Sequence, residues 1–220
     1  MLPPLDLLPS LLTGLLVTLQ ITAGAAVVAL ASSFLAGLGR LSGRKSVRGF
    51  SRLYVDVFRG TSALVQLFWA FFALPLLGIR LEAVTVGILV LGLNLGSYGS
   101  EIVRSAIRNV SRSQYDAARA LNLSRGQTLW RIILPQAALR MIPPFGNLFI
   151  ELLKGTALVS LISLADLTFQ GQTLRTSTLR SGEIFALILV LYFLLAQVIA
   201  RGMRFLESRL AAGRDSGGAA

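Results

Sequence analysis

The chain has 220 residues, of which 54% are hydrophobic, and its mean hydropathy of +0.71 places it among membrane proteins. Its formal net charge of +11 comes from basic residues confined to short segments between apolar runs, a pattern that reflects membrane orientation and disfavours nucleic-acid binding. The absence of Cys and His excludes disulfides, thiolate catalysis and the commonest metal ligands, so we expect neither a metal nor a cofactor.

Five apolar stretches are about long enough, at roughly 20 residues, to cross a bilayer as helices. The first runs from Leu7 to Gly39, and the basic segment after it has no acid between Arg40 and Arg52. Positive charge favours the cytoplasmic side, so this segment is predicted inside and the N-terminus outside. The remaining spans are expected at 60–79, 83–100, 141–164 and 184–200.

These spans predict one all-α, polytopic membrane domain over residues 1–210, with its C-terminus inside. Residues 211–220 are expected to be a disordered cytoplasmic tail, because they are small and polar. Pro143 and Pro144 interrupt the fourth span. The segment 166–183 has mixed charge and is expected to lie outside the membrane as a connecting segment. Five spans without an internal repeat suggest half of an assembly, completed by a second copy or a sister subunit.

The polar segment 109–137 lies between the third and fourth spans and is predicted to be cytoplasmic. Two hydroxyl residues, each followed three positions later by a polar side chain, match patterns that open helices. Ser113 with Asp116 is expected to begin one short helix, and Ser124 with Gln127 a second. The segment is therefore predicted to be a folded loop that binds a soluble protein.

Two further residues define the expected shape of this loop. Asn122 is expected to close the first short helix in the left-handed conformation, which Asn tolerates better than most residues. Pro135 is expected to end the second helix. A helix-turn-helix between membrane spans is most simply explained by a partner on the same side of the membrane.

Polar residues inside the spans are candidates for a transport route. Glu151 and Lys154 lie three residues apart on one helical face, and charges at this depth usually pair or line a polar cavity. They form either a structural ion pair or part of a route that suits a zwitterion. Thr156 follows this pair closely in the chain, at a point where the backbone could locally depart from the helix. Gln66 and Asn94 either join helices by hydrogen bonds or line the same route.

Two other charged residues lie at the expected inner end of the second span. Asp56 and Arg59 are interpreted as an interfacial pair at that position.

The sequence contains no GxxxxGK[ST] phosphate loop, no HExxH and no GxSxG motif, which disfavours a membrane enzyme. The energy for transport must therefore come from another protein or from an ion gradient. The predicted docking loop favours another protein. A gradient-driven secondary transporter of a small zwitterion is the alternative.

The segment 114–137 resembles the EAA loop of ATP-binding cassette importer permeases, which reads EAA, three residues, G, nine residues and I-x-L-P. The matching positions are Asp116, Ala117 and Ala118 for EAA, Asn122 for the glycine, and Ile132, Leu134 and Pro135 for the close. Residues 58–68 (FRGTSALVQLF) and 152–160 (LLKGTALVS) resemble the polar amino-acid uptake branch, of the histidine and glutamine permease type. Taken together, these segments are also similar to those of ectoine and hydroxyectoine permeases.

The resemblance implies a type I importer permease fold in a bacterial inner membrane and a non-catalytic subunit that moves a polar amino acid or an ectoine-type compatible solute. It implies as partners two cytoplasmic ATPase subunits, a second permease, identical or sister, and an extracytoplasmic solute-binding protein. The candidate ATPase-docking residues are Asp116, Ala117, Ala118, Ala120, Asn122 and Leu123. The candidate substrate-pathway residues are Gln66, Asn94, Glu151, Lys154 and Thr156.

Overall fold

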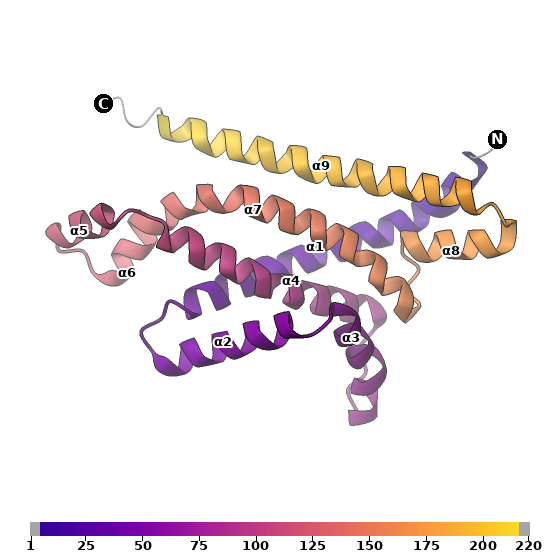
Figure 1. The fold of residues 1–220 in the computed structure, drawn as a ribbon, viewed down its shortest axis with the longest axis horizontal. Helices are drawn as coiled ribbons and strands as arrows, with labels where there is room; N and C mark the ends of the chain where they lie inside the picture. The colour runs from indigo at the N-terminus through magenta and orange to yellow at the C-terminus, as the bar shows by residue number, and fades with distance from the viewer. Residues whose placement is uncertain (1–4, 216–220) are drawn as a thin grey trace.

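The computed structural model describes residues 5–215, and every regular element in that range is helical (Figure 1). A short 3-10 turn (Leu5–Leu7) precedes α1 (Leu8–Gly39), and the other long helices are α4 (Ala83–Arg108), α7 (Leu134–Gly155) and α9 (Ser181–Asp215). Four helical segments of the described chain are long and apolar enough to cross a membrane, and a bent helix pair gives a fifth. The predicted all-α membrane fold with five spans is confirmed.

The centre of the bundle is the packing of α1 against α4. Glycines on α4 let the two backbones approach closely, as is usual between membrane helices. A Cβ atom added at Gly92 would lie 2.6 Å from the Cβ of Val28 and 3.0 Å from the carbonyl oxygen of Ala25. Ser33 is buried at the same contact and donates to the carbonyl oxygen of Gly96 across 3.2 Å.

The second span differs from the expected single helix over 60–79. The chain forms α2 (Lys45–Gly60) and then α3 (Ala63–Phe68), and the two axes meet at an angle of 101°. A π-helical turn η2 (Trp69–Ala73) and a 3-10 turn η3 (Leu74–Leu77) continue α3. Most of the basic segment expected as a loop therefore belongs to a helix. Arg52 is exposed on α2 and Arg48 is half-buried, and the buried residues of this helix are Ser51 and Val55.

The fourth span is a continuous helix where a break was expected. A π-helical turn η4 (Thr128–Ile133) leads into α7, and Pro135 stands in the first turn of α7, a position that tolerates a missing N–H. Pro135 therefore opens α7, and the prediction that it ends a helix is wrong. Pro143 and Pro144 lie inside α7 without breaking it, because packing against α4 and α9 supports the helix on both sides. A 3-10 turn η5 (Thr156–Ile162) follows.

The segment 166–183, expected outside the membrane as a connection, contains a helix, α8 (Leu167–Thr178), which lies beside the start of α1 (Figure 1). Asp166 caps this helix, because its carboxylate accepts from the backbone N–H groups of Phe169 and Thr168 across 2.9 and 3.2 Å. The side chain is fully buried, and burial raises the pKa of the Asp166 carboxyl group. The N–H of Leu167 donates to Thr18 of α1 across 3.1 Å.

The two ends of the bundle carry different elements (Figure 1). The short helices α5 (Arg112–Ala120) and α6 (Arg125–Gln127) lie at one end and α8 lies at the other. α1 begins at the α8 end, whereas α9 ends on the side of α5 and α6. α9 continues to Asp215, so the beginning of the tail expected to be disordered over 211–220 is helical, and 216–220 lie outside the described residues.

Candidate functional site

The loop between α4 and α7 has the predicted two-helix form, with one error at its start. Ser124 and Gln127 form both hydrogen bonds of a capping box, 2.9 and 3.3 Å long, which confirms the second helix start. Asn122 has a φ of 53°, which confirms the left-handed turn between the helices. The first helix begins at Arg112 without a side-chain cap, so the expected cap by Ser113 is wrong.

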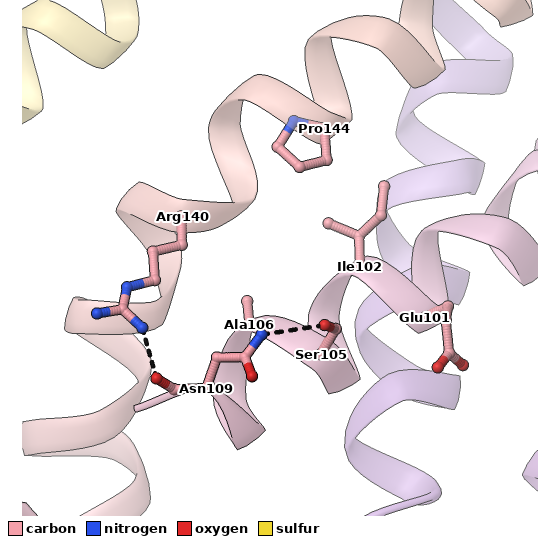
Figure 2. Close-up of a pocket in the computed structure, with 7 residues that line it drawn as sticks. All are labelled: Glu101, Ile102, Ser105, Ala106, Asn109, Arg140 and Pro144. Atoms are coloured by element: carbon pink, nitrogen blue, oxygen red, sulfur yellow. Dashed lines mark hydrogen bonds between the residues drawn. The ribbon is translucent and has the colours of Figure 1, made fainter. Parts of the chain in front are cut away.

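The loop is fastened to both helices that it joins. The Gln136 side-chain amide donates to Gln114 of α5 across 3.1 Å. The hydroxyl of Tyr115 donates to the carbonyl oxygen of Ile107 at the end of α4 across 3.4 Å. Arg140 of α7 donates to the carbonyl oxygen of Asn109 across 2.5 Å (Figure 2). The loop is therefore hydrogen-bonded to the end of α4 and to α7.

The outer face of α5 presents small side chains, and only part of the predicted docking set lies on it. Asp116, Ala117, Ala120 and Asn122 are exposed, and Leu123 is half-buried. Ala118 is 0% exposed. Its side chain is therefore not available to a partner in this conformation.

Two large apolar side chains on the loop were not among the predicted docking residues. Leu121 is 71% exposed and Trp130 is 61% exposed. Leu121 follows the end of α5 and precedes the left-handed residue Asn122, so its position in the turn could have indicated exposure. The sequence signal for Trp130 was weaker, because it lies in an apolar run that also contains the buried Ile133.

An open cavity of about 400 Å³ lies between α4 and α7 behind the loop (Figure 2). The lining residues shown there are Glu101, Ile102, Ser105, Ala106, Asn109, Arg140 and Pro144. Glu101 is held at one side of the cavity by Arg40 of α1, whose guanidinium lies 2.6 Å from the carboxylate, and by Arg104 of α4. The cavity therefore combines an apolar wall with charged groups fixed at its rim.

Gln66 and Asn94 lie together at the bend between α2 and α3. The Asn94 side-chain amide donates to the carbonyl oxygen of Phe58 across 3.0 Å and to Gln66 across 3.2 Å. Gln66 also donates to the carbonyl oxygen of Phe58 across 3.1 Å and to the hydroxyl of Thr61 across 2.7 Å. These hydrogen bonds satisfy backbone carbonyl groups that have no partner within the helix where α2 ends. The geometry favours the interpretation of hydrogen bonding between helices.

Glu151 and Lys154 are both exposed on α7 and are not paired with each other. Among the described residues, none of the ion pairs within 4.0 Å includes either side chain. Lys154 faces α9 across a cavity of about 440 Å³ that also contains Tyr192 and Gln197. An unpaired charge at the bilayer centre costs about 2.5 to 3.5 kcal/mol on insertion scales, so these side chains indicate a polar environment.

Thr156 does not open the backbone next to this pair. Its side chain is fully buried, and its hydroxyl donates to the carbonyl oxygen of Leu153 across 2.7 Å. The helical path instead continues into η5. Thr156 is therefore buried, whereas the charged residues that precede it in the chain are exposed.

The chain is similar in sequence to membrane permeases over almost its whole length. A probable amino-acid ABC transporter permease of Sinorhizobium fredii (strain NBRC 101917 / NGR234) is 50% identical over 209 residues, which cover 92% of this chain and 88% of that protein. The glutamine transport system permease protein of Escherichia coli (strain K12) is 34% identical over 205 residues, which cover 92% of this chain and 94% of that protein.

Solved structures show the same architecture. The crystal structure of an amino acid ABC transporter with histidines is 32% identical and has a TM-score of 0.86, covering 93% of this chain and 96% of that chain. The MetNI methionine ABC transporter in an inward-facing conformation shares the fold at 17% identity, with a TM-score of 0.78, covering 96% of this chain and 99% of that chain. The fold is that of a type I ABC importer permease.

The match to a family model covers most of the chain and agrees with the membrane spans. The model described as "Binding-protein-dependent transport system inner membrane component" matches residues 29–212, a range that begins inside α1 and includes α4, the loop, α7 and most of α9. The chain is therefore a multi-pass inner-membrane protein that belongs to the family of binding-protein-dependent transport system inner membrane components.

Proposed function

We propose that this chain is the non-catalytic permease subunit of an importer that moves a polar zwitterion, an amino acid, into the cytoplasm. Two cytoplasmic ATPase subunits bind the loop over 109–137 and supply the energy. The N-terminus then lies outside and the C-terminus inside. The observation that carries this proposal is the loop itself, which exposes a narrow helix face and is hydrogen-bonded to both α4 and α7.

The exposed face of α5 suits insertion into a groove on a partner. Ala117 and Ala120 lie three residues apart on the helix and leave little bulk between the helix backbone and a partner. The exposed Leu121 and Trp130 add apolar area at the same end of the bundle, and such exposed apolar side chains are typical of interaction surfaces. The ATPase-docking set therefore consists of the exposed predicted residues together with these two.

The exposed charges of α7 support a zwitterionic substrate. Glu151 and Lys154 present opposite charges, and neither forms an ion pair with another of the described residues. A second permease subunit, identical or sister, supplies the facing wall of the route, and an extracytoplasmic binding protein delivers the solute. The relatives named for amino acids favour an amino acid over an ectoine-type compatible solute.

Reconstitution tests this proposal against a gradient-driven carrier. The permease is placed in liposomes with its ATPase subunits and binding protein, and uptake of labelled L-glutamine, L-histidine and ectoine is measured with and without enclosed ATP. We expect ATP-dependent uptake of an amino acid and no uptake by the permease alone under an imposed proton or sodium gradient. Gradient-driven uptake without ATPase subunits would contradict the proposal, and transport of ectoine alone would correct the substrate.

Replacing Lys154 with methionine is expected to reduce uptake of the amino acid about 10- to 100-fold, the loss that follows removal of a charged hydrogen bond. Methionine keeps the apolar length of the side chain, so assembly with the ATPase subunits is expected to persist. The matched control is Lys45→Met, which removes the exposed lysine at the start of α2. A parallel loss of assembly and uptake in Lys154→Met would favour a structural role for this lysine.

A further inference from the structure

The last turn of α2 carries an exposed charged residue, Arg59, that is not among the residues of the proposed route. The guanidinium carbon of Arg59, in the last turn of α2, lies 4.9 Å from the centre of the Tyr98 ring of α4. Tyr98 is 41% exposed, although the residues on either side of it from Asn94 to Ser100 are buried. An arginine over an aromatic face is a stabilising arrangement that holds the guanidinium in a defined plane.

Arg59 lies beside the middle part of α4, over the ring of Tyr98. Tyr98 follows the start of α4 by about 22 Å and precedes its end by about 15 Å, at the helical rise of about 1.5 Å per residue. The expected interfacial pair of Asp56 and Arg59 is not formed, since the described residues include no ion pair within 4.0 Å at either side chain. A free cation at this depth indicates a route that admits water or a charged ligand.

The open side of α4 continues from Tyr98 to the docking loop. Ile102, Ser105 and Asn109 follow Tyr98 at positions that share one face of the helix, and these three residues line the cavity behind the loop (Figure 2). The opposite side of α4 carries Gly92 and packs against α1. Arg59 therefore lies over a residue on the same face of α4 that, closer to the loop, lines this cavity.

We propose that Arg59, held on the ring of Tyr98, binds the carboxylate of the transported zwitterion and so selects for it. This inference rests on the proposed function and names the substrate group that the pathway recognises. The planar guanidinium can donate two parallel hydrogen bonds to a carboxylate. Its stacking on Tyr98 leaves the N–H edge of the guanidinium free for a ligand.

Direct binding to the purified complex of permease and ATPase subunits separates this role from delivery by the binding protein. The probes are labelled L-glutamine and L-histidine together with their α-carboxamides, which lack the negative charge. For Arg59→Gln we expect affinity for the amino acids to fall about 10- to 100-fold and affinity for the carboxamides to change little. Arg59→Lys is expected to lie between the two. Arg52→Gln, which removes an exposed arginine earlier in α2, is the control and is expected to bind normally.

Each result decides between the alternatives. Unchanged affinity of Arg59→Gln, an equal loss for the carboxamides, or an equal loss in Arg52→Gln would overturn the role of Arg59. So would a wild-type complex that transports the amino acids but does not bind them without the binding protein. A wild-type complex that transports neither amino acid in liposomes would instead refute the proposed function, on which this inference depends.

Discussion

The variant Ala117→Arg is expected to lose ATP-driven uptake by a factor of about 100 or more while its permease still folds in the membrane. Ala117 is exposed on α5, so a larger side chain has space within the chain itself. It would prevent a close fit in the groove of an ATPase subunit, and loss of a central contact at an interface commonly costs 2 kcal/mol or more, about 30-fold in affinity. The added positive charge increases the effect if that groove carries basic residues.

Co-purification of the ATPase subunits and uptake into liposomes are the measurements for Ala117→Arg. The control is Gly43→Arg, which adds the same side chain where a new Cβ would meet no atom within 4 Å, in the connection between α1 and α2. Ala118→Arg is expected to behave differently, because Ala118 is fully buried and the larger side chain would dislodge the loop. Normal uptake and normal ATPase association in Ala117→Arg would show that the ATPase does not bind α5.

Features set by neighbouring residues could be predicted from the sequence. The capping box of Ser124 and Gln127 and the left-handed Asn122 formed as expected, because each depends on hydrogen bonds or backbone preferences within a few residues. The long apolar helices could also be predicted, because a bilayer requires every backbone polar group of a span to be satisfied within the helix.

Features that depend on tertiary packing could not be predicted in this way. The bend of 101° after Gly60 is held by Asn94, which lies 34 positions later in the chain and donates to the carbonyl oxygen of Phe58. The start of α8 is likewise fixed by Thr18, a residue of α1 that accepts from the N–H of Leu167. No local pattern in the sequence identifies such distant partners.

The candidate sites show the same division between local and distant effects. The sequence predicted that the helix now seen as α5 binds the partner, but it could not show that Ala118 is buried while Ala117 is exposed. That difference depends on how the helix is fastened to α4 and α7. For Glu151 and Lys154, the spacing allowed an ion pair, and only the structure shows that both side chains are exposed and unpaired within the described chain.

The variant Gly92→Leu is expected to lower the free energy of unfolding by about 3 kcal/mol or more, because the added side chain overpacks a close contact between α1 and α4. Its first carbon alone would lie 2.6 Å from the Cβ of Val28 and 3.0 Å from the carbonyl oxygen of Ala25. The obstruction includes backbone and a branched Cβ, so no side-chain rotation relieves it and α1 must move away from α4.

Separation of α1 from α4 would also displace Tyr98 and the cavity between α4 and α7. Gly92→Leu is therefore expected to lose both stability and uptake. Thermal unfolding of the detergent-solubilised permease, followed by size-exclusion chromatography, measures the first effect. Gly49→Leu is the matched control, since a Cβ at Gly49 of α2 meets no atom within 4 Å. Unfolding temperatures that are equal in the two variants would mean that α1 and α4 are not held at this distance. The position of the cavity between α4 and α7 would then have to be fixed by a different pair of helices.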